Sequence, residues 1–170
     1  MGLRHRARRL ALQGLCCLDV QGDHAMDLVR QFIDDSDEQP SALAAAHQLL
    51  TEAYTRRRDC DELLTRHAKH WDLSRLAMVD RNILRLAVSE LRTAATPPKV
   101  VITEAIQLAR EFSTSESSRF VNGVLDAVMR ELQAARPQQP APPQEPTEPP
   151  EPPNPQSDSS NPQSAIHNPQ

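Results

Sequence analysis

The apolar residues of this chain recur at the spacing of an α-helix through its first 135 residues, and this periodicity most constrains the possible fold. Leu and Ala return every three or four positions, and no segment alternates apolar and polar residues as a half-buried strand does. Glycine, which destabilises helix interiors, occurs only four times in the whole chain. The periodicity therefore predicts an all-α fold.

Seven segments show the helical period, and we expect each to form one helix. Their apolar residues fall at 10–18, 26–33, 43–54, 63–64, 76–91, 102–112 and 121–132. About 135 residues are enough to build one hydrophobic core without disulfides or structural metals. The sequence thus predicts a bundle of about seven helices.

Several residues are expected to mark helix ends. Pro40 should begin the third helix, and Arg56–Arg58 should end it, because cations suit the negative end of a helix dipole. Ser113 and Glu116 match a capping box for the last helix. Gly123 lies inside that helix, where we expect it to permit a close approach to a neighbouring helix.

Proline divides the chain into two regions. Of the 15 prolines, 12 follow Arg136, whereas all 19 Lys and Arg lie at or before it. The proline-rich region has Ile166 as its only large apolar residue, too little to offset the entropy of ordering. We expect a helical domain over 1–135 and a disordered, partly polyproline-II tail over 136–170. Because 19 of the 23 acidic residues also precede the tail, the helical domain is neutral, and nucleic-acid binding requires local clustering of cations.

The sequence offers no membrane segment, disulfide framework or catalytic motif. No run approaches the ~18 apolar residues of a membrane-spanning helix, and Gln13 and Asp19 interrupt the only candidate for a signal peptide. Three cysteines without CxxC spacing are typical of reduced thiols, so we expect a cytoplasmic protein. Cys60, His67 and His70 share a helix face but lack the spacing and the fourth ligand of a zinc site. We predict no enzyme activity, metal or cofactor.

The densest group of cations lies at the start of the first predicted helix. It comprises Arg4, His5, Arg6, Arg8 and Arg9. Arginine at a helix N-terminus opposes the helix dipole, so this placement costs stability unless an anion compensates. Guanidinium groups bind phosphates and stack on unpaired bases, which suits single-stranded RNA. The alternative is a solvated, charged helix end.

Five blocks of residues resemble the NusB family in their order and spacing. They are RARRLALQGL (6–15), WDLSRL (71–76), VDRNILRLA (79–87), PPKV (97–100) and FVNGVLD (120–126), with Glu90, Leu91, Glu104 and Ala105 between them. The resemblance spans residues 4 to about 132. It implies two packed helical sub-bundles and a transcription antitermination factor that binds boxA-type RNA of nascent rRNA transcripts with ribosomal protein NusE. It also implies action within the transcription elongation complex.

The resemblance assigns roles to particular residues. It places the start of the last helix near RNA, so Glu116, Arg119 and Phe120 join Arg4, Arg6, Arg8 and Arg9 as expected RNA contacts. Phe120 would stack on a base, although half-buried packing is an equal alternative. The resemblance also places the NusE surface on the fifth helix, with Asp80 and Arg81 as expected contacts. An ordinary solvated face is the alternative there, and Arg85 is expected to form an intramolecular ion pair.

Two other readings of the chain stay open at this point. NusB-like helical domains also occur attached to rRNA cytosine methyltransferases, so the chain could be an RNA-recognition module that acts in trans with such an enzyme. It could also be a homodimer or a larger homo-oligomer that hides its arginine surface.

Overall fold

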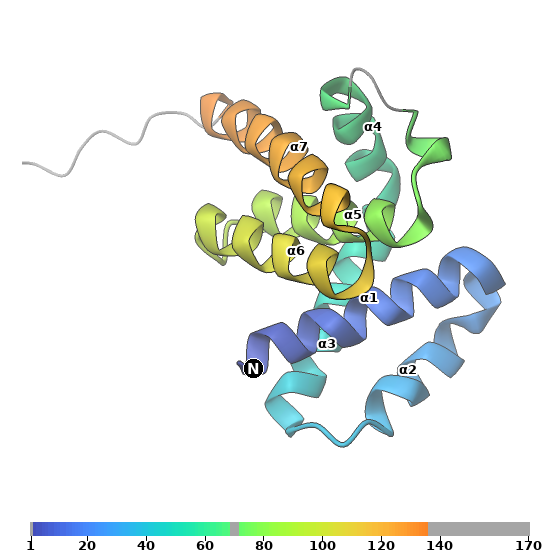
Figure 1. The fold of residues 1–170 in the computed structure, drawn as a ribbon. Coiled ribbons are helices and arrows are strands. Elements are labelled where there is room, and N and C mark those ends of the chain that lie inside the picture. Colours follow the sequence, from blue (N-terminus) through green and yellow to red (C-terminus); the bar gives the residue numbers. More distant parts are fainter. Residues whose placement is uncertain (1, 69–71, 136–170) are drawn as a thin grey trace, which may run out of the picture. The chain divides into compact units, whose positions relative to one another are not determined.

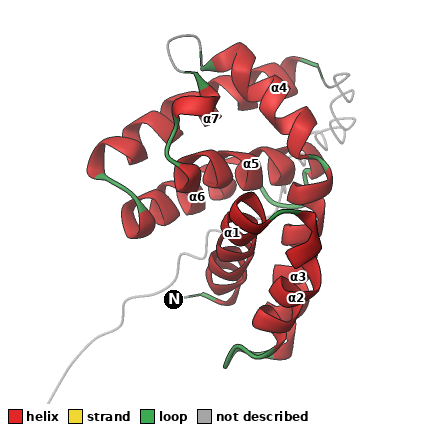
Figure 2. Cartoon of the chain, turned by 90° about the vertical axis from the view of Figure 1, so that its right-hand side faces the viewer, coloured by secondary structure: helices red, strands yellow, loops and turns green. Residues whose placement is uncertain are grey.

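The computed structural model describes residues 2–68 and 72–135, and the regular elements in these ranges are all helical (Figures 1 and 2). Two short 3₁₀ turns, Asp23–Ala25 and Leu73–Arg75, accompany the α-helices. The α-helices are α1 (Leu3–Gln21), α2 (Met26–Asp34), α3 (Pro40–Thr55), α4 (Arg57–His67), α5 (Met78–Thr93), α6 (Pro98–Phe112) and α7 (Ser115–Ala134). The prediction of an all-α fold with about seven helices is confirmed.

The helices form two groups that share one core. In the first group α1 packs against α2 and α3, and in the second α5 packs against α6 and α7, with α4 beside them. Both views show the first group below the second (Figures 1 and 2). Helices α1 and α3 also pack on α5, and this contact joins the groups. The two packed sub-bundles implied by the resemblance are therefore present.

Helix α5 is the most deeply buried element. Ten of its 16 residues are buried, and they include Leu84 and Val88 as well as Ile83 and Leu86. The helix needs two apolar faces because α1 and α3 cover one side of it while α6 and α7 cover another.

Two glycines occur within helices, and only one of them lies at a close contact. A Cβ atom added to Gly14 of α1 would lie 2.7 Å from Val29 of α2 and 3.1 Å from Leu50 of α3. A Cβ atom added to Gly123 of α7 would meet no atom within 4 Å, and Gly123 is exposed. The expectation that Gly123 permits a close helix approach is wrong, and Gly14 has that role instead.

The boundary between α3 and α4 differs from the prediction. Helix α3 ends at Thr55, and Arg57 begins α4, so Arg56–Arg58 do not form the last turn of one longer helix. The guanidinium of Arg57 nevertheless donates a hydrogen bond of 2.9 Å to the carbonyl of Tyr54 and lies over its ring. A cation thus satisfies a carbonyl at the end of α3, as the dipole argument requires, but from the following helix.

The cap of α7 also differs from the predicted capping box. Thr114, not Ser113, is the N-cap residue, and its hydroxyl accepts a hydrogen bond from the Ser117 amide. The Ser113 hydroxyl donates to the Ser117 hydroxyl instead. The chain starts α7 one residue later than the Ser113–Glu116 spacing suggested.

The predicted proline-rich tail, 136–170, lies outside the described residues, so the division into 1–135 and 136–170 stays a prediction. Within the described ranges, no helix combines the length and the apolar character needed to cross a bilayer.

Candidate nucleic-acid interface

The cations at the start of α1 point to different sides of that helix because successive side chains are about 100° apart. Arg4 is exposed and makes no ion pair with any residue in the described ranges. Arg6 lies 2.8 Å from Glu38, which precedes α3, and Arg9 lies 2.9 Å from Glu111 of α6. About a third of each of these two side chains, 33% and 37%, remains exposed, so a polyanion can reach them.

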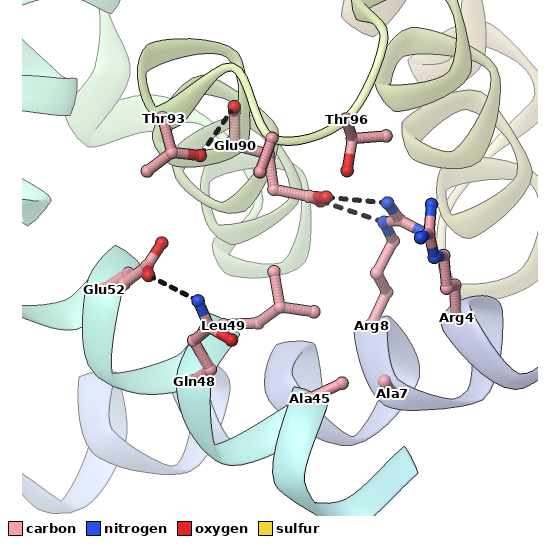
Figure 3. Close-up of a pocket in the computed structure, with 11 residues that line it drawn as sticks. Arg4, Ala7, Arg8, Ala45, Gln48, Leu49, Glu52, Glu90, Thr93 and Thr96 are labelled. Atoms are coloured by element: carbon pink, nitrogen blue, oxygen red, sulfur yellow. Dashed lines mark hydrogen bonds and ion pairs between the residues drawn. The ribbon is translucent and has the colours of Figure 1, made fainter. Parts of the chain in front are cut away.

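Arg8 differs from its neighbours because it is buried. Its Nε and Nη2 donate hydrogen bonds of 2.9 and 2.6 Å to the two carboxylate oxygens of Glu90 on α5, as Figure 3 shows. Its Nη1 lies 3.5 Å from the Glu104 carboxylate. Burial by itself would lower the pKa of Arg8, but the hydrogen bonds and charge of Glu90 raise it. Arg8 ties α1 to α5, and only 3% of its side chain is exposed. Contrary to our expectation, its guanidinium is therefore not accessible to RNA.

His5 joins the same end of α1 to α6. Its Nδ1 lies 2.9 Å from Glu104 and its Nε2 lies 3.3 Å from Glu111, and the ring is buried. Glu104 and Glu111 are seven residues apart and therefore lie on one face of α6. This face meets His5, Arg8 and Arg9 and supplies the anions that compensate the cationic helix start. The anions that the dipole argument called for are thus, in large part, carboxylates of the protein itself.

The start of α7 follows closely after Phe112, which contacts one of these cations. The Arg9 guanidinium lies 5.7 Å from the centre of the Phe112 ring at the end of α6, and α7 begins three residues later at Ser115. The side chains of Glu116 and Arg119 are exposed on the first turns of α7. Phe120 is half-buried and packs against the core, so part of its side chain remains exposed. No described contact joins Glu116 or Arg119 to the α1 cations.

The expected partner-binding residues on α5 are held by other helices. Asp80 is buried, and its Oδ2 accepts a hydrogen bond of 2.8 Å from the Ser117 hydroxyl of α7. Its Oδ1 has no hydrogen-bond partner among the described residues. Arg81 donates a hydrogen bond of 3.0 Å to Asp19 of α1 and keeps 23% of its side chain exposed. Asp80 therefore connects α5 to the start of α7.

Arg85 forms the intramolecular ion pair that we expected, and it does so twice. Its guanidinium bonds to Asp61 of α4 at 2.7 Å and to Asp19 of α1 at 3.0 Å. Burial alone would raise the pKa of Asp19, but the hydrogen bond from Arg81 and the charge of Arg85 lower it. Asn82 donates a further hydrogen bond of 3.0 Å to Asp19. Three helices thus converge on a network centred on Asp19.

The cysteine and histidines considered for a metal lie in other surroundings. Cys60 is buried, and burial raises the pKa of its thiol to about 11. His67 bonds to Glu131 of α7, and His70 lies outside the described residues. The part of the chain that the structure describes contains no group of three or more metal-ligating side chains placed to share an ion.

Sequence reasoning found the cationic helix start but not its carboxylate partners. Glu90, Glu104 and Glu111 lie 82 to 106 positions away from the side chains they bind. No local pattern shows which arginine or histidine each glutamate binds. Two signals were available: Glu90 and Glu104 belong to the family resemblance, and the seven-residue spacing of Glu104 and Glu111 puts both on one helix face.

Comparisons with known proteins agree on one family. The model of the NusB family matches residues 5–130. The transcription antitermination protein NusB of Solibacter usitatus is 45% identical over 134 residues, which cover 78% of this chain and 92% of that protein. The protein of the same name from Koribacter versatilis is 41% identical over 140 residues, with 81% and 96% covered.

Solved structures show the same similarity. NusB from T. maritima superposes with a TM-score of 0.70 at 32% identity, covering 75% of this chain and 91% of that chain. A chain from a crystal structure of the antitermination factors NusB and NusE in complex with dsRNA superposes with a TM-score of 0.69 at 27% identity. That match covers 76% of this chain and 97% of the other.

Proposed function

The chain belongs to the NusB family, and we propose that it acts as a transcription antitermination factor that binds RNA. Its relatives are named for transcription antitermination and not for a chemical reaction. The observation that best supports the proposal is the accessible cationic start of α1. There Arg4, Arg6 and Arg9 reach solvent on different sides of one helix end.

The RNA is a single-stranded, boxA-type segment of a nascent rRNA transcript. Arg4, Arg6 and Arg9 contact its phosphates, and the Phe120 ring stacks on a base. On the first turns of α7, Arg119 adds a fourth cation, and the Glu116 carboxylate accepts a hydrogen bond from a base amino group. Arg8 supports this surface from within by fixing α1 on α5.

The protein partner is ribosomal protein NusE, and the complex acts within the transcription elongation complex. One of the similar solved structures contains NusB together with NusE and RNA, which supports this assignment. Arg81 exchanges its bond with Asp19 for a group of NusE, and Asp80 holds the adjacent start of α7 in place. Two modest contacts, one with NusE and one with RNA, then combine into tighter binding.

The proposal is tested by titrating a boxA-type RNA with the protein, with and without NusE, and following fluorescence anisotropy. We expect affinity to rise when NusE is present. With only a few phosphates neutralised, log affinity should fall against log salt with a slope of about −2 to −3. If NusE has no effect on RNA affinity, the proposal is contradicted. In a separate measurement, light scattering of the free protein distinguishes a monomer from a homodimer.

Matched variants test the assigned residues. Arg9→Ala should weaken RNA binding, whereas Arg130→Ala, which removes the same charge from an exposed position near the end of α7, should not. Arg81→Ala should weaken co-purification with NusE, whereas Arg58→Ala on the exposed side of α4 should not. Equal effects within either pair would mean that net charge, not position, determines binding.

A further inference from the structure

A cavity of about 190 Å³ opens beside the cationic start of α1. It lies between α1, α3 and the end of α5, and Figure 3 shows the side chains around it. One wall is the pair of Arg8 and Glu90, whose hydrogen bonds use both carboxylate oxygens of Glu90. Because both residues are buried and bonded to each other, this wall is rigid.

The remaining lining is apolar on one side and polar at the rim. Ala7, Ala45 and Leu49 form the apolar part. The rim carries Gln48 and Glu52 of α3. The Gln48 amide donates a hydrogen bond of 2.9 Å to one carboxylate oxygen of Glu52, and the other oxygen accepts none from a described residue. Thr96, in the loop after α5, points its hydroxyl toward Arg8 and Glu90 (Figure 3). No described residue accepts a hydrogen bond from this hydroxyl.

Arg4 stands at the edge of the same cavity. It is exposed, and no described carboxylate pairs with it. The charged side chains around the cavity are balanced, because Glu52 and Glu90 are matched by Arg4 and Arg8. A balanced lining suits an uncharged group inside the cavity, whereas Arg4, which no described carboxylate pairs with, can bind a phosphate outside it.

The size of the cavity limits its occupant. It is more than ten times the ~10–15 Å³ that one water needs, yet it is smaller than the ~300–1,000 Å³ of sites for whole cofactors. A single planar base is an appropriate size. A flat apolar surface beside hydrogen-bonding groups is also the arrangement by which proteins hold unstacked RNA bases.

We propose that this cavity binds one unpaired base of the RNA, a base that carries an exocyclic amino group, while Arg4 binds the adjoining phosphate. The amino group donates to the open oxygen of Glu52, and the Thr96 hydroxyl donates to a ring nitrogen or carbonyl. This inference rests on the proposed RNA-binding function and adds a specificity site to it. Adenine, cytosine and guanine have the required amino group, and uracil does not.

The test uses substitutions that fill or alter the cavity. Ala45→Leu places a larger side chain in it, and Ala44→Leu makes the same change at the neighbouring exposed position of α3. Thr96→Val removes the hydroxyl at nearly constant shape. In titrations of boxA-type RNA with the full chain, we expect Ala45→Leu and Thr96→Val to weaken binding about fivefold, the effect of one or two hydrogen bonds. Ala44→Leu should leave the affinity unchanged, and thermal melts confirm that all three proteins fold.

A series of RNAs with one abasic nucleotide each identifies the bound base. One abasic position should weaken binding to the unmodified protein about fivefold and should not weaken binding to Ala45→Leu any further. Replacing the base at that position by uracil should have a similar effect. The cavity inference fails, while the proposed function survives, if the unmodified protein and Ala45→Leu bind RNA equally well. The same conclusion follows if every effect of an abasic nucleotide persists in Ala45→Leu. If the unmodified protein does not bind RNA with or without NusE, the proposed function fails as well.

Discussion

Arg6 and Arg8 are two positions apart on one helix, yet their guanidinium groups lie in opposite surroundings. Arg6 is a third exposed beside Glu38, and Arg8 is buried against Glu90. A buried charge pair is costly to break because removal of one partner leaves the other unpaired in a medium of low polarity. An exposed pair contributes little, since water and salt screen it. Two arginines of one motif therefore have different roles.

Replacing Arg8 should affect folding, whereas replacing Arg6 should not. We expect Arg8→Ala to lower the free energy of unfolding by about 3 kcal/mol or more, because Glu90 would remain buried and unpaired. Arg6→Ala should cost less than about 1 kcal/mol. Urea denaturation followed by circular dichroism measures both values. Similar losses from the two variants would mean that the Arg8–Glu90 pair does not stabilise the fold.

In the proposed complex with RNA, Glu111 would compete with RNA for Arg9. Because the carboxylate lies 2.9 Å from the Arg9 Nε, an incoming phosphate must displace it. Glu111→Gln should therefore raise RNA affinity by up to about fivefold, the equivalent of the ~1 kcal/mol that an exposed ion pair contributes at most.

The matched control for this variant is Glu62→Gln, which removes the same charge from an exposed position on α4. Anisotropy titrations at low salt give the clearest difference, because screening is weakest there. An equal gain in both variants would assign the effect to net charge and not to release of Arg9.

At the scale of the helices, close packing constrains α1 more than α7. Gly14 brings α1 against α2 and α3, whereas Gly123 has open space beside it. Gly14→Ala should destabilise the protein, since the new methyl group would lie 2.7 Å from Val29. Gly123→Ala should stabilise it by about 0.5–1 kcal/mol through the better helix propensity of alanine. Thermal melts of the two variants should shift in opposite directions, and a loss from Gly123→Ala would contradict the packing described above.

The network around Asp19 links α1, α4 and α5 and should respond to pH. The pKa of Asp19 is lowered in the folded protein, so its stabilisation is present above the unfolded pKa of about 3.9. That stabilisation disappears as pH falls through the lower, folded pKa. Asp19→Asn should therefore lower stability at pH 7, and the difference from the unmodified protein should shrink below about pH 4.

Denaturation at several pH values measures this difference. Asp27→Asn, at an exposed carboxylate of α2 that lies 3.4 Å from Arg30, is the control and should show no comparable pH dependence. A constant difference between the unmodified protein and Asp19→Asn down to pH 2 would exclude the charge of Asp19 as the cause.

For the molecule as a whole, buried apolar residues of α1–α7, together with Ala25 of the first 3₁₀ turn, form one continuous core within the described ranges. Residues 137–170 lack the apolar side chains to extend such a core. We expect truncation after Arg136 to change the melting temperature by less than about 2 °C, a shift that corresponds to well under 1 kcal/mol. A drop of several degrees would mean that these residues pack on the helices.

The periodicity of Leu and Ala was enough to predict the helices and their approximate positions, because helix formation depends on residues three and four positions apart. Pro40 predicted the start of α3, since proline is favoured in the first turn of a helix. It was not enough for the details of helix ends. The guanidinium of Arg57, from the following helix, satisfies an open carbonyl of α3, and the hydroxyl of Thr114, just before α7, accepts from an open amide of α7. Several nearby residues could have done so.

The amino-acid sequence by itself determined that this chain is helical, that its cations cluster at one helix start, and which family it resembles. These are properties of short segments and of their order. Only the tertiary structure decided that Arg8 is buried while Arg4, Arg6 and Arg9 reach solvent, that Gly14 and not Gly123 lies at a close contact, and that a cavity opens beside Arg4. Burial and charge pairing depend on which side chains meet across the core, and those partners lie as many as 106 positions away.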